Sequence, residues 1–230
     1  MELSGPIHGK GVLILGGYLL RKYTQNGPLS LSASLVFEQS YHMVEGDSAS
    51  LAELCVLLSA IAGVPLRQDV AVTGSVNQHG QVQPVGGVTE KVEGFFDLCR
   101  ARGLNGTQGV LIPAANRRHL MLRDDLLEAV RSGQFHVWTV EDMDALLQLL
   151  SGLPCGEPDA AGVYPEGSVH SLVSNRLDEF GRTLRPLLRL PKRKDLTKAK
   201  ADTLSRAWLS ATEPHPGLTE FQRAPRPWEL

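Results

Sequence analysis

The chain has 230 residues, of which 42% are hydrophobic and 21% are charged, and its formal net charge is −2 at pH 7. This composition supplies a core for one large domain or for a domain with appendages, and the near-neutral charge gives no overall attraction to nucleic acid or acidic membranes. The apolar run from Val12 to Leu20 is too short to span a bilayer and lacks a cleavage site of small residues, so no membrane or exported segment is predicted.

The first part of the chain predicts two helices separated by a strand. Apolar residues at helical spacing indicate a helix over roughly residues 9–24, closed by the Asn-Gly-Pro sequence at residues 26–28. Residues 29–38 alternate apolar side chains with serine, which is typical of a half-buried strand. Residues 51–62 are apolar almost all round and predict a fully buried helix.

Ser48 lies where this buried helix begins. Asp47 could cap the helix, or Ser50 and Glu53 could form a capping box. In both cases Ser48 lies at or just before the first turn, where free backbone N–H groups and the helix dipole favour an anion. From the local sequence alone, Asp47 and Ser48 could also be capping residues without further function.

The stretch from Val70 to Lys91 predicts a hairpin that leads into a helix. Residues 70–76 and 81–85 have strand character around a turn, and the Gly-Gly pair at residues 86–87 ends the second strand. A helix then begins near Val88 and places Lys91 at the border of its apolar stripe. A lysine in this position is either a stem along the core edge with its ammonium in water, or a desolvated amine.

The following segments alternate strands and helices. Residues 110–112 predict a short buried strand stopped by Pro113, residues 124–131 a short helix, and residues 135–140 a further strand. A last helix with Met143, Leu146, Leu147 and Leu150 completes the pattern. The alternation indicates an α/β domain over residues 1–152.

The composition changes after residue 152. Residues 153–168 are rich in Pro, Gly and Ala and predict a linker, and residues 169–185 predict one amphipathic helix. Residues 186–230 form a basic, proline-containing tail that we expect to be disordered.

The spacing of the three cysteines and the lack of a phosphate-binding loop exclude two kinds of site. Cys55, Cys99 and Cys155 have no metal-ligand spacing, so they are predicted to be reduced core residues of a cytoplasmic protein without a metal site. No GxxxxGKS/T phosphate loop is present, which argues against ATP hydrolysis by that route.

Two segments carry a resemblance to a known family. EGDSAS at residues 45–50 and PVGGVTEK at residues 84–91 resemble the motifs of the proteolytic domain of the Lon family of ATP-dependent serine proteases. The serine and lysine of these motifs map to Ser48 and Lys91, and the 43 positions between them are the separation expected of the family. The similarity covers roughly residues 7–152 and includes Thr73-Gly74 and the H-x-K-G opening at His8.

Two departures from the family pattern accompany the resemblance. The EGDSAS variant, with Ser75 where many members have a glutamate, is similar to a divergent branch of the family. The AAA+ ATPase region and the first strands of the proteolytic domain are absent from the sequence, so the chain resembles a carboxy-terminal fragment.

The resemblance implies a Lon-type fold of class α/β (α+β), with mixed sheets and flanking helices. It implies a serine endopeptidase in which Ser48 is the nucleophile and Lys91 the general base of a Ser/Lys dyad. A serine hydroxyl needs such a base. Lysine can act as one only as the neutral amine, which burial against Val88 and Phe95 would favour.

Three further residues are expected to support this dyad. Thr73 would orient the pair, as the family pattern implies. Glu45 would either position the serine loop or face water as a loop carboxylate. The backbone N–H groups around Asp47 and Ser48 would stabilise the oxyanion. A triad through His42 lacks an evident orienting acid.

The family also implies partners and leaves alternatives open. The chain would be the proteolytic module of an ATP-dependent degradation machine that acts on unfolded or misfolded polypeptides. A homo-oligomer, hexameric by family resemblance, and an AAA+ ATPase in cis or in trans are expected. No cofactor is expected in this chain, since ATP and Mg²⁺ belong to the absent AAA+ region. The alternatives are an inactive, assembly-only Lon-like scaffold, and a nucleic-acid-binding module that acts through basic residues 192–200.

Overall fold

The structure is a computed structural model, and it describes residues 4–24, 27–37, 40 and 42–187. The chain divides into two compact units, Met1–Leu184 and Arg185–Leu230. Of the tail predicted over residues 186–230, positions 188–230 lie outside the described residues. The first unit contains the predicted α/β domain.

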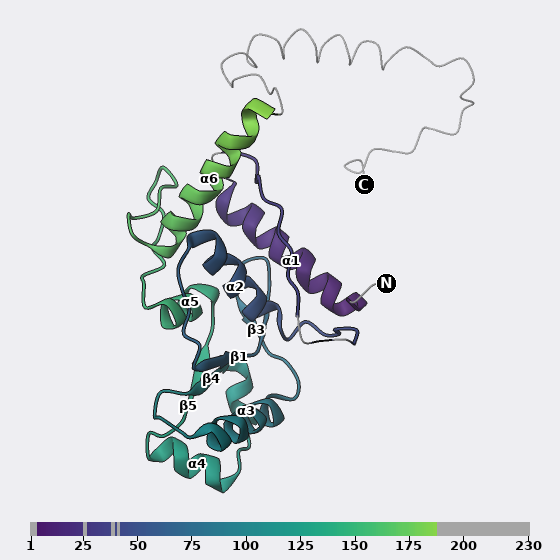
Figure 1. Ribbon diagram of the computed structural model, residues 1–230, viewed down its shortest axis with the longest axis vertical. Helices are drawn as coiled ribbons and strands as arrows, with labels where there is room; N and C mark the ends of the chain where they lie inside the picture. The colour runs from purple at the N-terminus through teal and green to yellow at the C-terminus, as the bar shows by residue number, and fades with distance from the viewer. Residues whose placement is uncertain (1–3, 25–26, 38–39, 41, 188–230) are drawn as a thin grey trace, which may run out of the picture. The chain divides into compact units, whose positions relative to one another are not determined.

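A three-stranded parallel sheet lies in the lower half of this unit as drawn in Figure 1. Its strands are β1 (Val70–Val72), β4 (Gly109–Pro113) and β5 (His136–Val140), in that order. A separate antiparallel pair joins β2 (Ser75–Val76) to β3 (Val82–Gln83). Parallel and antiparallel pairing together with helices confirm the predicted mixed α/β class.

Helices form a hydrophobic core on each face of the sheet. They are α1 (Pro6–Tyr23), α2 (Ser50–Ala62), α3 (Val88–Arg102), α4 (Asp124–Arg131), α5 (Met143–Ser151) and α6 (Val169–Leu187), with a short 3-10 helix, η1 (Ala114–His119). Except for η1, each of these lies where the sequence periodicity places a helix, because the hydrogen bonds and the apolar stripe of a helix are both local in sequence.

The central strand β4 separates two hydrophobic cores. Leu111 faces a core formed with α1, α2, α5 and α6, whereas Val110 and Ile112 face a second core formed with α3 and α4. Successive side chains of a strand point to opposite faces of the sheet, so a short continuous apolar run fits a strand that is buried on both sides.

The continuous strand predicted over residues 70–76 is interrupted at Thr73 and Gly74. The Gly74 N–H donates to the Ser48 carbonyl at 2.9 Å, and the Gly74 carbonyl accepts from the Leu51 N–H at 3.2 Å. A Cβ atom at position 74 would lie 2.8 Å from Leu51 Cδ2, so glycine permits this close approach of the chain to α2. The break divides the stretch between two sheets and ties the end of β1 to the serine loop.

The prediction of a strand over residues 29–38 is wrong for residues 29–37, which the structure describes. Residues 29–37 form no strand, and Val36 is 76% exposed. A strand needs a neighbour to satisfy its backbone hydrogen bonds, and no strand of the described residues pairs with this one. Alternation alone therefore did not determine the structure of this segment.

The segment after α5 connects to α6 through short-range contacts. Residues 153–168 contain no helix or strand, and the N–H groups of Val169 and His170 donate to the carbonyls of Pro154 and Cys155. The apolar face of α6 is buried at Val169, Val173 and Leu177 against the same core as α1 and α2. The amphipathic pattern thus corresponds to a helix that packs on the domain.

Candidate active site

Ser48 lies in the turn that leads into α2. The N-cap residue of this helix is Ala49, which has helical backbone angles and no side-chain cap hydrogen bond. Both predicted caps are therefore wrong. The Ser50 Oγ accepts a hydrogen bond from the Val76 N–H at 3.3 Å, and Glu53 pairs with His8 instead of closing a capping box. The start of α2 is fixed by neighbouring segments rather than by its own side chains.

The structure brings Lys91 to Ser48. Lys91 lies in the first turn of α3, and its Nζ is 2.9 Å from the Ser48 Oγ. The Thr73 Oγ1, at the carboxyl end of β1, is 3.3 Å from the same Nζ. Three residues predicted for one site thus meet within hydrogen-bond distance, although 43 positions separate the serine from the lysine.

The surroundings of Lys91 differ from the expectation. Val88 is buried and Phe95 half-buried, but Lys91 itself is exposed. Its stem runs along the edge of the stripe toward the serine turn, so helix α3 presents the amine at the surface. The desolvation expected from Val88 and Phe95 is therefore not supplied by the described part of this chain.

Thr73 is held where β1 ends. Its side chain is buried, its N–H donates to the Leu111 carbonyl at 3.1 Å, and its Oγ1 lies 3.5 Å from the Ser48 carbonyl. These contacts fix the hydroxyl between the serine turn and Lys91. The Thr73 hydroxyl thus lies within hydrogen-bond distance of the lysine amine.

Asp47 and Ser75 form a contact that the sequence did not predict. The buried Ser75 donates from its Oγ to the Asp47 Oδ2 at 3.0 Å, and this orients the carboxylate. Within the described part of the chain, the backbone N–H groups of Asp47 and Ser48 have no acceptor. Two amides beside the serine hydroxyl are therefore available to an incoming oxygen.

Glu45 contacts the start of α1 from the loop before the serine, and it is also exposed, so both roles expected for it stay open. Its Oε1 accepts a hydrogen bond from the Ile7 N–H at 3.0 Å, at the start of α1, and the Gly5 N–H donates to the Val44 carbonyl at 2.8 Å. A carboxylate at this end of a helix satisfies a free donor and interacts favourably with the dipole. The amino-terminal helix is thereby attached to the serine loop.

A second attachment was missed in the sequence. The His8 Nε2 is 2.7 Å from the Glu53 Oε1, and Glu53 is only 5% exposed. The pair joins α1 to α2 one turn after the serine turn. The only signal in the sequence is that His8 belongs to the H-x-K-G opening, whose role the motif by itself does not indicate.

Glu45 offers a direct test of this attachment. We expect Glu45→Ala to lower the free energy of unfolding by about 1 kcal/mol, because the Ile7 N–H loses its acceptor and the α1 dipole loses a charge. Glu45→Gln keeps an oxygen at the same place and should lose clearly less. Urea unfolding followed by circular dichroism measures both values, and equal losses for the two variants would show that the hydrogen bond contributes nothing.

These observations define the class of the protein as an α/β domain with a candidate serine–lysine site at the carboxyl end of a parallel strand. The model of the Lon protease (S16) C-terminal proteolytic domain matches residues 42–151, which include Ser48, Thr73 and Lys91. This part of the chain belongs to the Lon family of proteases.

Curated relatives carry the same family name. A putative Lon protease homolog of Escherichia coli (strain K12) is 53% identical over 152 residues, which are 66% of this chain and 26% of that protein. The putative Lon protease homolog of Haemophilus influenzae is 45% identical over 177 residues, 77% of this chain and 30% of that protein. An archaeal Lon protease from Thermococcus kodakarensis is 33% identical over 131 residues, 57% of this chain and 19% of that protein. The chain thus spans less than a third of the length of these relatives.

Proposed function

We propose that this chain is the proteolytic module of an ATP-dependent protease and cleaves polypeptides as a serine endopeptidase with a Ser48/Lys91 dyad. The single observation that carries the proposal is the 2.9 Å separation of the Ser48 Oγ and the Lys91 Nζ. The match of residues 42–151 to a Lon proteolytic domain supports the same reading. A hydroxyl beside an amine is an arrangement in which the amine can act as the base.

In the proposed reaction, the neutral Lys91 amine accepts the proton of Ser48 as the serine oxygen attacks the peptide carbonyl. The Asp47 and Ser48 N–H groups stabilise the negative oxygen that forms. The Lys91 ammonium then protonates the leaving amine, which leaves an acyl group on Ser48. Water hydrolyses this ester with Lys91 again as the base. Thr73 accepts a hydrogen bond from the Nζ and holds it toward the serine throughout.

Because Lys91 is exposed, a group that covers the site would change the solvation of its amine. An exposed ammonium is well solvated, and the neutral base is favoured when water is removed. A polypeptide laid over the serine turn would exclude this water. We therefore propose that bound substrate, or another part of the complete protein, completes the surroundings of the amine.

The substrates and partners follow from the same proposal. Unfolded or misfolded polypeptide is the substrate, an AAA+ ATPase in cis or in trans delivers it, and the modules assemble as a homo-oligomer. Among the described helices, none has both the length and the apolar character needed to cross a membrane. The three cysteines are buried and free, which supports a reducing compartment such as the cytoplasm.

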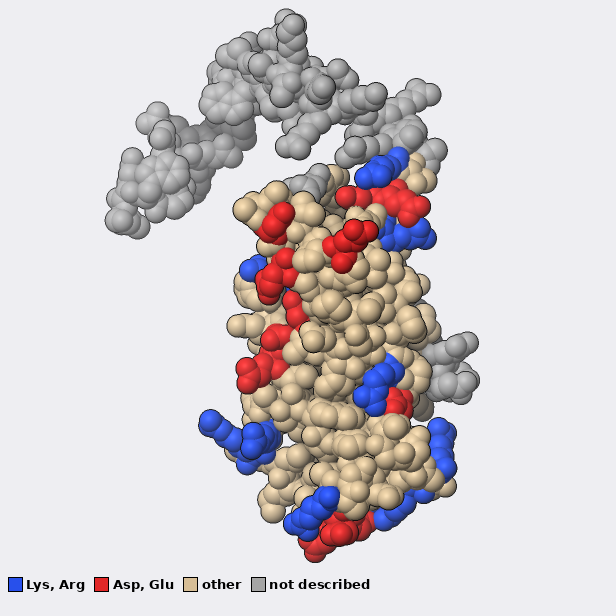
Figure 2. Space-filling view, turned by 90° about the vertical axis from the view of Figure 1, so that its left-hand side faces the viewer, with Lys and Arg blue, Asp and Glu red and all other residues tan. Residues whose placement is uncertain are grey.

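Neither rival function has a specific observation in its favour. The basic residues 192–200, on which nucleic-acid binding would depend, lie outside the described residues. On the described part of the face in Figure 2, Lys and Arg side chains do not gather into one large patch. An assembly-only scaffold that keeps the Ser48/Lys91 pair would not hydrolyse peptides, so a hydrolysis assay distinguishes the two functions.

The proposed function is tested by labelling the serine. We expect a fluorogenic peptide to be hydrolysed by the chain, and a serine-reactive phosphonate to stop the reaction with one adduct, located on Ser48 by mass spectrometry. An adduct on a different serine, or hydrolysis that persists in the fully labelled protein, would contradict the dyad. Absence of both hydrolysis and labelling would favour the assembly-only scaffold.

A further inference from the structure

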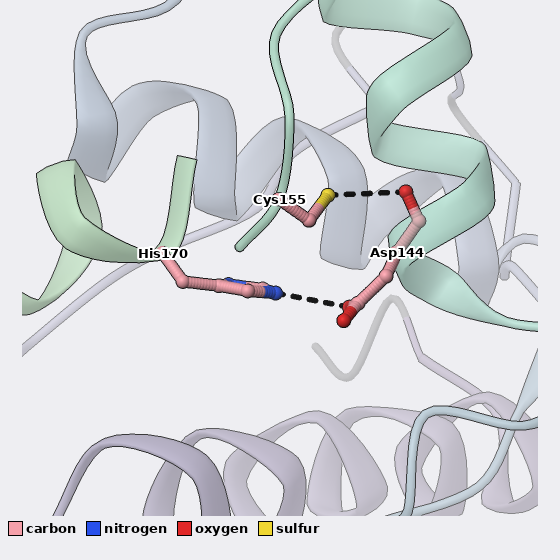
Figure 3. Close-up of side chains that lie close together, drawn as sticks. All are labelled: Asp144, Cys155 and His170. Atoms are coloured by element: carbon pink, nitrogen blue, oxygen red, sulfur yellow. Dashed lines mark hydrogen bonds and ion pairs between the residues drawn. The ribbon is translucent and has the colours of Figure 1, made fainter. Parts of the chain in front are cut away.

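Three side chains that commonly bind metals meet beside α5 (Figure 3). Asp144 comes from α5, Cys155 from the segment that follows it, and His170 from the second residue of α6. One ligand atom from each residue lies within 4.8 Å of the other two. The group has no role in the proposed protease site.

The cluster is mostly buried, and Asp144 is its most exposed member. His170 is 0% exposed and Cys155 is 5% exposed, whereas 35% of the Asp144 side chain is exposed. The thiol and the imidazole are thus fixed in the interior, and the carboxylate connects them to the surface.

The contacts of His170 fix its ring. The Nδ1 is 2.6 Å from the Tyr23 hydroxyl, and the Nε2 is 3.0 Å from the Asp144 Oδ1. When Nδ1 carries the proton and donates to the Tyr23 hydroxyl, the Nε2 lone pair points toward the Asp144 carboxylate and can bind a metal ion. Histidines that bind metals usually donate their other ring N–H to a hydrogen-bond acceptor.

Lys22 restricts the site without closing it. Its Nζ is 2.8 Å and 2.9 Å from the two carboxylate oxygens of Asp144, so one oxygen can remain paired with Lys22 while the other binds an ion. His170 Nε2 and Lys22 Nζ both contact the Oδ1 oxygen, so the carboxylate is held between these two side chains.

Cys155 keeps its proton when no ion is bound. Its Sγ donates to the Asp144 backbone carbonyl at 3.0 Å. A thiol in this state is a weak nucleophile. A metal ion would replace the proton, and the thiolate would then turn away from that carbonyl oxygen toward the cation.

We propose that Asp144, Cys155 and His170 form a zinc site that fastens α6 and the segment before it to α5. Bonds of about 2.0–2.3 Å in tetrahedral zinc place the ligand atoms roughly 3.3–3.7 Å apart. The three atoms lie within 4.8 Å of one another, so displacements on the order of 1 Å complete the site, with water as the fourth ligand. Zinc binding releases the Cys155 proton to solvent and leaves the His170 proton on Nδ1, bonded to Tyr23.

The sequence did not indicate this group because its members are far apart. Asp144 precedes Cys155 by 11 positions and His170 by 26, which corresponds to no zinc motif. The packing of α6 against α1 and α5 brings them together.

Cobalt provides a direct test, since Co²⁺ occupies zinc sites and absorbs visible light when a thiolate binds it. We expect the full chain, freed of metal, to bind one Co²⁺ with a thiolate–cobalt absorption band that Zn²⁺ abolishes. Cys155→Ser and His170→Gln should weaken binding at least tenfold, and Tyr23→Phe should weaken it by about 10–100-fold. Cys99→Ser is the matched control, because Cys99 is a buried cysteine of the other core.

Several outcomes would overturn the proposal. They are a wild-type chain without the band, a band that survives in Cys155→Ser, and a band lost equally in Cys99→Ser. If His170→Gln fails to fold, Cys155→Ser decides, because it changes a single atom. Zn²⁺ should raise the Tm of the wild type and leave that of Cys155→Ser unchanged, and equal shifts would place the ion elsewhere.

Discussion

Lys91→Arg is expected to be inactive toward peptides although it keeps the positive charge. The guanidinium stays protonated at every pH that the protein tolerates, so it cannot accept the Ser48 proton. We expect hydrolysis to fall by on the order of 10³-fold or more, because a catalytic base and nucleophile act as a unit. Initial rates with a fluorogenic peptide measure the loss.

The stability of the Lys91 variants separates chemistry from folding. Lys91 is exposed, and surface substitutions usually change the free energy of unfolding by less than about 0.5 kcal/mol. Lys91→Met and Lys91→Arg should therefore unfold at nearly the same temperature as the wild type while both are inactive. Lys10→Arg, at an exposed position on α1, is the matched control and should keep full activity. An active Lys91→Arg protein would refute the proposed base.

Ser48→Ala is expected to abolish peptide hydrolysis and leave the fold intact. The serine supplies the only protein atom in the proposed reaction that forms a covalent bond to the substrate, so the loss should reach on the order of 10⁴-fold. Ser48 is not the N-cap of α2, and within the described residues its hydroxyl bonds to the Lys91 Nζ alone. We therefore expect a change in the free energy of unfolding of no more than about 1 kcal/mol.

The control for Ser48→Ala is another serine. Ser132→Ala removes a hydroxyl that bonds to two carbonyls of the helix it follows, far from the dyad in sequence, so it should keep activity. Purified Ser48→Ala protein must also fail to react with the phosphonate. Hydrolysis retained by this variant, after any contaminating protease has been excluded, would end the dyad proposal.

The sequence by itself determined the helices and the identity of the candidate pair. The helices α2 and α4 begin and end within about two residues of their predicted limits, and α3 begins where predicted, because helix hydrogen bonds join residues four apart and their signals are local. The resemblance selected Ser48 and Lys91 from two short motifs and their separation. Neither inference required knowledge of how distant segments pack.

The tertiary structure decided the features that depend on neighbours distant in sequence. The strand predicted over residues 29–38 had no partner among the described residues, and the one predicted over residues 70–76 was divided at Gly74 by its approach to α2. Only the packing of α3 showed that Lys91 is exposed, although its helical position allowed burial. The contact of Asp144 with His170 likewise exists only because α6 packs on α5. Sheet pairing, solvent exposure and contacts between elements are set by the whole chain, and for that reason no local pattern contains them.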